Sequence, residues 1–488
     1  MVGDRVCQEI FLPIAVMSSS TPTPSPFTYD LICIGSGPAG QRAAIQAAKF
    51  GKRVAVIEKK RVVGGMCLDT ATIPSKTFRE AVLSFTGLHQ RWAHSPDTPK
   101  ARPTAQQLVA RVTEVIRIEG AVLYDQLRRN DVTLLQGEAS FIDPHTLAVH
   151  TEHGSHKASS DHILIAVGTI PTPPPNIPID GKHIFDSDGV IRLQHLPRTM
   201  TVVGAGIIGT EYASMLGALG IEVTLVDSRF RPLEFLDGEI VDELIYQMRN
   251  HQVTFRLGES VEQLVISNTP PRKVILHLAS GKRLVSDLVL YSVGRTGATA
   301  TLELENAGLK ADARGRLQVD QQFRTPVSHI LAAGDVIGFP SLASTSSEQG
   351  RLAACHAFGI EAEPMDTQFP VGIYSIPEIS MVGSTEEQLT LQKIPYEVGM
   401  ARYREIARGT IMGDQNGMLK MLFHRNDHRL LGVHAIGTGA TELIHIGQAI
   451  LNTERGLEYF LTTVFNYPTL AECYKVAALD AYNKLREP

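Results

Sequence analysis

Cysteine is scarce in this chain, basic residues are not in excess, and long apolar runs are missing. The five cysteines are odd in number and scattered (Cys7, Cys33, Cys67, Cys355 and Cys473), which excludes a secreted disulfide scaffold and a zinc cluster. A net charge of −5 argues against a basic nucleic-acid-binding surface. No apolar stretch approaches the roughly 20 residues that cross a bilayer. These absences predict a cytoplasmic protein with neither nucleic-acid nor membrane partners.

The chain is long enough for several hydrophobic cores. Its 488 residues predict roughly two to four domains, and 43% apolar with 20% charged residues is typical of globular proteins. The N-terminal segment differs, because its apolar residues 10–17 are interrupted by Pro13 and followed by serines, threonines and prolines. We predict a flexible tail over residues 1–26, with either Met1 or Met17 as the initiator.

The most informative pattern is a G-x-G-x-x-G motif that occurs twice. Each copy follows an apolar strand and precedes a helical stretch, and the next strand ends in an acidic residue at the same distance from the first glycine. The residues are Gly35, Gly37, Gly40 and Glu58 in the first copy, and Gly204, Gly206, Gly209 and Asp227 in the second.

This pattern has a physical basis in dinucleotide binding. The first glycine permits a tight turn, the second lets the backbone approach a pyrophosphate, and the third allows close packing of helix on strand. The helix N-terminus offers free N–H groups to the phosphates, and the acid accepts a hydrogen bond from a ribose. Two copies in the full strand and helix context predict two dinucleotide-binding units.

The order of the remaining segments predicts that the second unit is inserted in the first. The proline-rich residues 170–178 separate the units, and an apolar strand at 330–333, ending before Gly334 and Asp335, closes the first. From about residue 366 the pattern is mixed strand and helix without a phosphate loop. We predict an α/β protein with two Rossmann-like domains and a C-terminal α+β domain, bounded at 27–168 with 291–365, 169–290, and 366–488.

With these pieces in order, residues 29–480 resemble the FAD-dependent pyridine nucleotide-disulfide oxidoreductase superfamily, class I. Three segments place the chain near those members that exchange hydride between nicotinamide dinucleotides: Gly64–Lys76, which ends in Ile-Pro-Ser-Lys, Tyr374–Ser380, and Phe465–Thr469. The resemblance implies that the first domain binds FAD, that the inserted domain binds NAD or NADP, and that the C-terminal domain forms a homodimer or higher homo-oligomer.

The resemblance also implies roles for individual residues. Lys76 lies near the flavin N5 and pairs with Glu211, and we expect these two to be catalytic, because a fixed cation stabilises reduced flavin. The first motif and Glu58 hold the adenosine half of FAD, and the second motif holds the nicotinamide dinucleotide. The other expected cofactor contacts are Gly65, Cys67, Ala139, Asp227, Arg229, Gly294, Asp335 and Ala343. The histidines, His434 and His445 among them, show no metal-ligand spacing, so we expect no bound metal.

The chain departs from the superfamily at its dithiol. Disulfide-using relatives carry Cys-x4-Cys before Ile-Pro-Ser-Lys, but here Cys67 is followed by Thr72 at the second position. Those relatives also carry His-Pro as the acid and base for the thiol, where this chain has Tyr467 before Pro468. A tyrosine is a poor general base at neutral pH. Thiol exchange is therefore not the expected reaction; Cys67 is inert or forms a sulfenic acid or mixed disulfide, and the role of Glu472 stays open.

The residues at and after the end of the strand in the second motif bear on whether the site prefers NAD(H) or NADP(H). Asp227 favours NAD(H), since a carboxylate accepts from a 2′-hydroxyl and repels a 2′-phosphate. Arg229 and Arg231 follow it, and guanidinium suits phosphate. This combination predicts a site that admits both cofactors, although an exposed charged loop is the plainer alternative for the two arginines.

The expected reaction is hydride transfer between NADPH and NAD+ by a ping-pong mechanism through the flavin N5. A diaphorase or quinone reductase would use the same reductive half with another acceptor. A dihydrolipoamide dehydrogenase and a non-catalytic flavin redox sensor are further alternatives. The physiological direction is not legible in the sequence.

Overall fold

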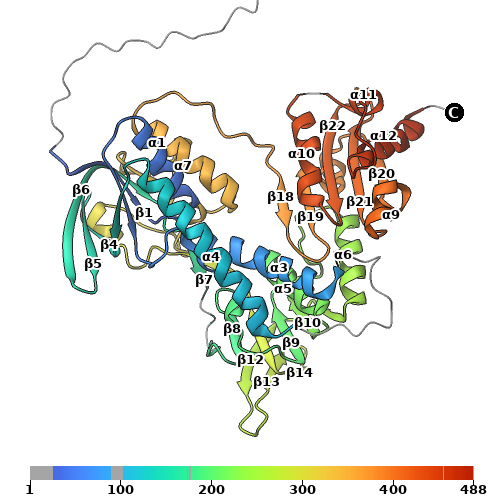
Figure 1. The fold of residues 1–488 in the computed structure, drawn as a ribbon, viewed down its shortest axis with the longest axis horizontal. Coiled ribbons are helices and arrows are strands. Elements are labelled where there is room, and N and C mark those ends of the chain that lie inside the picture. Colours follow the sequence, from blue (N-terminus) through green and yellow to red (C-terminus); the bar gives the residue numbers. More distant parts are fainter. Residues whose placement is uncertain (1–25, 89–102, 173, 175–176, 454, 487–488) are drawn as a thin grey trace, which may run out of the picture.

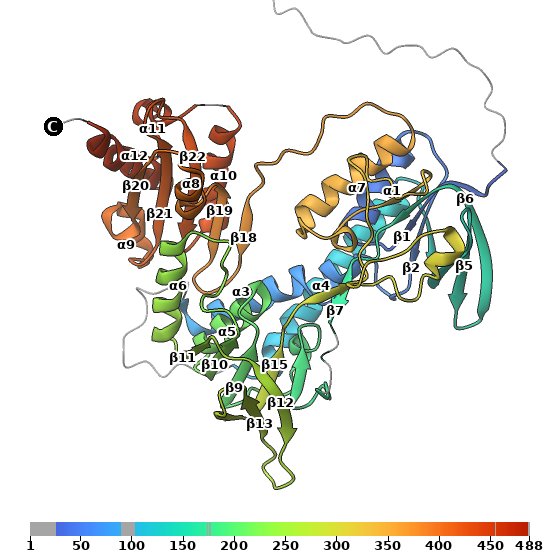
Figure 2. The same ribbon diagram turned by 180° about the vertical axis from the view of Figure 1, so that it is seen from behind.

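The computed structural model describes residues 26–88, 103–172, 174, 177–453 and 455–486. Nearly all of the predicted N-terminal tail, with Cys7 and both candidate initiators, lies outside these residues. The described chain forms three bodies, each with its own sheet (Figures 1 and 2). Among the described residues, no helix has both the length and the apolar character needed to cross a bilayer.

The first body is built on a seven-stranded sheet in the order β3-β2-β1-β6-β5-β4, with β17 also paired to β6. The C-terminal part of β6 lies parallel to β1 and β17, and its N-terminal part lies antiparallel to β5. One long strand therefore joins a parallel half to a three-stranded meander. The strands are β1 (Tyr29–Ile34), β2 (Val54–Glu58), β3 (Thr133–Gln136), β4 (Glu138–Asp143), β5 (Thr146–Thr151), β6 (Gly154–Ile165) and β17 (Ile330–Ala332).

Helices α1 and α7 lie side by side on this sheet, although they are far apart in sequence (Figure 1). Their close approach needs Gly350, because a Cβ there would lie 2.0 Å from the carbonyl oxygen of Ala39. The helices of this body are α1 (Pro38–Lys49), α2 (Gly65–Asp69), α3 (Thr72–Thr86), α4 (Ala105–Arg128) and α7 (Ala343–Ala357), with short 3-10 turns η3 (Leu304–Ala307) and η4 (Asp335–Ile337).

The second body is a five-stranded parallel sheet in the order β11-β10-β9-β15-β8, with a separate meander of β12, β13 and β14. All these strands fall between β6 and β17 in sequence, so the second body interrupts the first. The elements are β8 (Ile184–Asp186), η2 (Val190–Arg192), β9 (Thr199–Val203), α5 (Ile207–Ala218), β10 (Glu222–Asp227), α6 (Gly238–Asn250), β11 (Val253–Leu257), β12 (Val261–Ile266), β13 (Val274–Leu278), β14 (Arg283–Ser286) and β15 (Leu288–Tyr291).

A two-stranded ribbon connects these bodies, because β7 (Thr169–Pro171) and β16 (Arg295–Gly297) pair antiparallel. The stiff linker predicted at 170–178 thus begins as a strand. A proline is tolerated at such an edge because the ribbon has no strand beyond it. The second sheet runs to Tyr291, one residue past the boundary predicted at 290.

The third body is a five-stranded antiparallel sheet in the order β18-β19-β22-β21-β20. Stacked rings of Phe460 and Tyr474 lie in its core. Its elements are β18 (Val371–Ile373), β19 (Ile379–Gly383), α8 (Glu386–Gln392), β20 (Tyr396–Arg402), η5 (Tyr403–Glu405), α9 (Ala407–Met412), β21 (Met418–His424), β22 (Leu430–Ile436), α10 (Ala440–Leu451), α11 (Leu457–Thr462) and α12 (Glu472–Leu485). The predicted class, two Rossmann-like units and a C-terminal α+β unit, is confirmed.

A buried lysine joins the second and third bodies. Lys420 on β21 is fully buried, and its ammonium contacts Asp237 at 2.9 Å, Glu239 at 3.1 Å, and Glu386. Asp237 is the N-cap of α6 in the second body, and Glu386 begins α8 in the third. These charges link the two bodies, with Lys420 and Asp237 buried and Glu239 and Glu386 partly exposed.

Candidate functional site

The first glycine motif lies where β1, β2 and β17 reach the same edge of the parallel sheet. Gly35 has a φ of +101°, and a Cβ there would lie 2.5 Å from the oxygen of Ala166. A Cβ at Gly40 would lie 1.9 Å from the oxygen of Gly35, whereas the direction at Gly37 is open to 4 Å among the described atoms. The loop is closed at its first and third glycines and open at the second, where a pyrophosphate would approach.

Glu58 is held at this edge by donors from the chain. Its carboxylate accepts from the N–H groups of Ser36 at 3.0 Å and Lys60 at 2.8 Å, and from the Ser36 hydroxyl. The Lys60 ammonium does not join them, because it pairs with Asp69. The carboxylate therefore keeps acceptor capacity for a ribose hydroxyl.

Gly334 and Asp335 follow β17 at the same edge. The N–H of Gly334 donates to the Gln349 side chain at 2.9 Å, which fixes the turn. Burial raises the pKa of Asp335, and Arg295 and the side chains of Ser346 and Thr169 oppose the rise.

Sequence reasoning did not single out Arg295 as a site residue. This side chain donates to Thr169, at 3.0 Å from Nε to the hydroxyl, pairs with Asp188 at 3.1 Å and contacts the Met66 sulfur. It thus connects the ribbon, the second body and the helix that carries Cys67. The only feature of the sequence that could have marked Arg295 as a site residue is its position directly after Gly294.

The second glycine motif repeats the geometry of the first. Gly204 has a φ of +104°, and a Cβ there would lie 2.7 Å from the oxygen of Ser292. A Cβ at Gly209 would lie 1.8 Å from the oxygen of Gly204, and the direction at Gly206 is again open among the described atoms. The described residues thus fit two dinucleotides, one at each sheet edge.

Asp227 ends β10 beside this second loop and is covered by Arg229. It accepts from the N–H of Ala205 at 2.5 Å and from three groups of Arg229: the backbone N–H at 2.8 Å, Nε at 2.9 Å and Nη2 at 2.7 Å. Burial acts to raise the pKa of Asp227, but the hydrogen bonds from Arg229 and Ala205 prevail and lower it. Arg231 points elsewhere, to the oxygen of Gly238 and to Asp242 at 2.6 Å.

Lys76 and Glu211 meet at the junction of all three bodies. The Lys76 ammonium on α3 lies 2.9 and 3.0 Å from the Glu211 carboxylate oxygens on α5. The N–H of Tyr374, from the loop after β18, donates to the same carboxylate at 2.8 Å, and the Tyr374 ring lies 4.8 Å from the ammonium. Glu211 is only 4% exposed and Lys76 25%. The predicted pair thus forms, and Tyr374 joins it through a contact that the sequence did not indicate.

Cys67 lies on α2, next to Thr72 at the start of α3. Burial raises the pKa of the Cys67 thiol, while a hydrogen bond with the Thr72 side chain and the charge of Lys76 oppose the rise. A thiol with a raised pKa is mostly protonated at neutral pH and is a weak nucleophile. The local environment therefore favours the inert alternative for Cys67.

No hydrogen bond joins the Tyr467 and Glu472 side chains among the described residues. Tyr467 is 68% exposed, and one Glu472 oxygen is buried with no hydrogen-bond partner among the described residues.

The remaining expected contacts are placed as follows. Gly65, with a φ of +59°, packs on the first motif, since a Cβ there would lie 2.7 Å from the Cα of Gly37. Gly294 follows β15 with a φ of +90°. Ala343 is the first residue of α7. Ala139 lies on β4 and is buried in the hydrophobic core of the first body, so its side chain faces packed residues and not an open surface.

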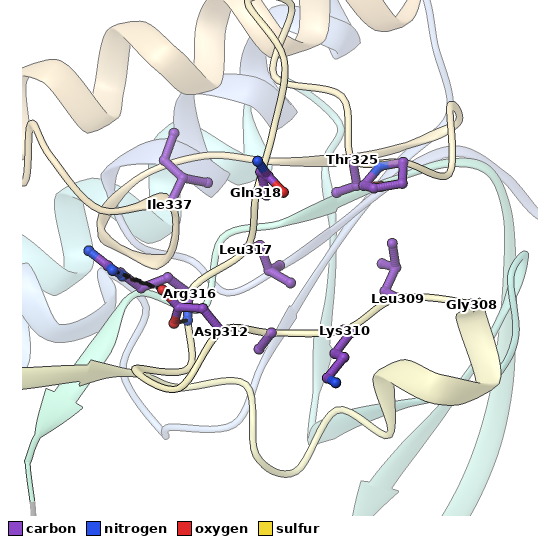
Figure 3. A pocket seen from close by; sticks show the side chains of 11 residues that line it. Gly308, Leu309, Lys310, Asp312, Arg316, Leu317, Gln318, Thr325 and Ile337 are labelled. Atoms are coloured by element: carbon purple, nitrogen blue, oxygen red, sulfur yellow. Dashed lines mark hydrogen bonds and ion pairs between the residues drawn. The ribbon is translucent and has the colours of Figure 1, made fainter.

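Two other features lie apart from these loops. A cavity of about 720 Å³ is lined by residues 308–312, 316–318, 325–326 and 337, and none belongs to a glycine motif. Figure 3 shows Asp312 and Arg316 paired at its rim, at 2.9 Å from Nε to the carboxylate. The carboxylates of Asp237, Glu239 and Glu386 are close enough to share a cation, but the Lys420 ammonium contacts all three.

Comparison with known proteins places this geometry in a family. The sequence profile of pyridine nucleotide-disulphide oxidoreductases matches residues 29–350, and the profile of their dimerisation domain matches residues 369–478. The chain belongs to this family. The two bodies that carry the glycine loops and the body with the C-terminal sheet thus fall within the two matched ranges.

Individual relatives span nearly the whole chain. A soluble pyridine nucleotide transhydrogenase of Mycobacterium bovis (strain BCG / Pasteur 1173P2) is 51% identical over 94% of this chain and 98% of its own length. One from Colwellia psychrerythraea is 44% identical over 94% of this chain and 99% of its own. The crystal structure of LpdA from Mycobacterium tuberculosis is 26% identical, with a TM-score of 0.85 over 94% of this chain and all of that one.

Proposed function

We propose that the chain is an FAD-dependent NAD(P)+ transhydrogenase, which transfers a hydride between NADPH and NAD+ without a redox disulfide. The observation that carries this proposal is Thr72, which stands beside Cys67 where a disulfide would need its second sulfur. Two intact dinucleotide loops remain in the same chain. The names of the curated relatives agree with the proposal.

Each part of the site has a role in this proposal. The first loop and Glu58 hold FAD, with Gly334 and Asp335 at its other end, and the second loop with Asp227 and Arg229 holds NAD(H) or NADP(H). FAD supplies a ring that accepts and returns two electrons. The Lys76–Glu211 pair fixes the Lys76 ammonium at the junction where the three bodies meet.

We assign the three bodies to three domains. Residues 27–168 and 291–365 bind FAD, 169–290 bind the nicotinamide dinucleotide, and 366–488 mediate homodimer formation, as the matching dimerisation profile supports. We place the protein in the cytoplasm.

A two-step reduction experiment tests the reaction. The FAD-loaded protein is reduced anaerobically with NADPH, freed of excess nucleotide and mixed with NAD+. We expect reoxidation of the flavin with a stoichiometric amount of NADH. Failure with NAD+ but rapid reoxidation by a quinone would instead identify a diaphorase, and appreciable lipoamide reduction would identify a dihydrolipoamide dehydrogenase.

The variant Cys67→Ser tests the absence of a sulfur relay. Because the thiol is partly buried and its pKa is raised, we expect unchanged NADPH-to-NAD+ turnover in a steady-state assay. Abolished turnover at full FAD content contradicts the proposed mechanism. Thr72→Ser is the matched control, since it keeps the hydroxyl beside Cys67.

A further inference from the structure

The two dinucleotide units differ in one contact that bears on cofactor choice. In both, the acid at the strand end accepts from the N–H after the first glycine and from the N–H two residues beyond itself. For Glu58 the donors are Ser36 and Lys60, and for Asp227 they are Ala205 and Arg229. The backbone frames of the two sites are therefore equivalent.

The side chains two residues after each acid behave differently. Lys60 turns to Asp69 and leaves Glu58 uncovered by its charge. Arg229 turns back and binds Asp227 through Nε and Nη2. A carboxylate has about four lone-pair positions, and the four N–H donors on Asp227 fill them.

We propose that Arg229 is a switch that competes with the ribose for Asp227 and thereby lets one site serve both dinucleotides. This rests on the proposed function and assigns how its nucleotide site reads the 2′ position. With Arg229 closed, Asp227 is neutralised and cannot accept from a 2′-hydroxyl. When Arg229 swings outward, the carboxylate becomes free for the 2′-hydroxyl of NAD(H).

The exposure of the pair supports both positions. Arg229 is 40% exposed while Asp227 is 7% exposed, so the guanidinium is the outer member and can leave without moving the sheet. Its Nη1 has no hydrogen-bond partner among the described residues, so this nitrogen is free to donate to a 2′-phosphate. Closed Arg229 thus cancels the repulsion from Asp227 and presents N–H donors to that phosphate.

The test uses adenosine fragments that carry no nicotinamide. ADP, with a free 2′-hydroxyl, and 2′,5′-ADP, with a 2′-phosphate, are titrated calorimetrically into the FAD-loaded protein. For Arg229→Ala we expect ADP to bind about two- to fivefold more tightly, because the partly exposed Arg229 no longer competes for the Asp227 carboxylate. We expect 2′,5′-ADP to bind about tenfold more weakly or worse.

Two further variants complete the test. Asp227→Asn should reverse the pattern, with tighter 2′,5′-ADP and weaker ADP. Arg231→Ala, which removes an arginine bound to Gly238 and Asp242, should change neither ligand. ADP binding to Arg229→Ala that is no tighter than to the wild type overturns the switch. Since neither fragment transfers hydride, the result stands apart from the reduction experiment.

Discussion

Replacing Lys76 with methionine will slow reduction of the FAD-loaded protein by NADPH by about 100-fold or more. Methionine keeps much of the side-chain length but removes the ammonium that lies 2.9 and 3.0 Å from the Glu211 oxygens. The buried Glu211 carboxylate is then left without its cation, and the positive charge at the junction is lost. Stopped-flow recording of the flavin absorbance measures the rate.

A second lysine, Lys52, serves as a control that distinguishes the loss of the charge at the junction from the loss of any positive charge. The Lys52 ammonium lies 4.8 Å from the Phe358 ring, the same distance as from Lys76 to Tyr374, but it is on the surface of the first body. Lys52→Met should reduce at the wild-type rate. A Lys76→Met protein that retains its FAD and reacts at a similar rate contradicts the assigned role.

Replacing Lys420 with methionine will lower the free energy of unfolding by about 3 to 5 kcal/mol. The change strands the Asp237 carboxylate, which is fully buried with Lys420, whereas Glu239 and Glu386 are partly exposed and recover water. Urea unfolding, followed by circular dichroism, gives the difference. Because Lys420 joins the third body to Asp237 of the second, we expect unfolding to begin at lower urea concentration than in the wild type.

Two comparisons define this prediction. Lys484→Met removes an exposed lysine that pairs with Asp480 four residues earlier, and it should cost no more than about 0.5 kcal/mol. Lys420→Met combined with Asp237→Asn should recover part of the loss, since no unpaired charge remains at that pair. Equal unfolding midpoints for Lys420→Met and Lys484→Met refute the buried-charge account.

Acid should weaken the same interface. Burial acts to raise the pKa of Asp237, but nearby positive groups, including the hydrogen-bonded Lys420, lower it below the usual value of 3.8. A depressed carboxyl pKa contributes stability that is present above the unfolded value and is lost as pH falls through the folded one. The difference in the free energy of unfolding between the wild type and Lys420→Met should therefore shrink below about pH 4, as urea unfolding at several pH values would measure.

The parts of the fold that were predictable are those that local chemistry dictates. A glycine such as Gly35 or Gly204 has a positive φ in a tight turn, and this need is written in the residue itself. The alternation of apolar strands with these turns then predicts parallel sheets. The ribbon of β7 and β16 was not predicted, because residues 169–171 acquire strand geometry only through a partner more than a hundred residues away.

The site contacts that the sequence did not predict also depend on partners that are distant in sequence or are chosen only on folding. Tyr374 lies in a segment that the sequence singled out, but it contributes its backbone N–H to Glu211, and since any residue type could donate that bond, no sequence pattern marks the contact. Arg295 and the capping of Asp227 by Arg229 depend on which neighbour each guanidinium finds after folding. The burial of Lys420 could not be predicted, since lysine is almost never fully buried unless paired. Its partners come from two segments that are distant in sequence.

The antiparallel pairing of β7 with β16 fixes the entrance and the exit of the inserted body as neighbours. An insertion whose two ends are adjacent can be exchanged as a cassette without disturbing the host sheet, since the host sees only a narrow stem. Evolution can therefore replace the inserted domain with one of different nucleotide specificity while the flavin-binding domain is inherited unchanged.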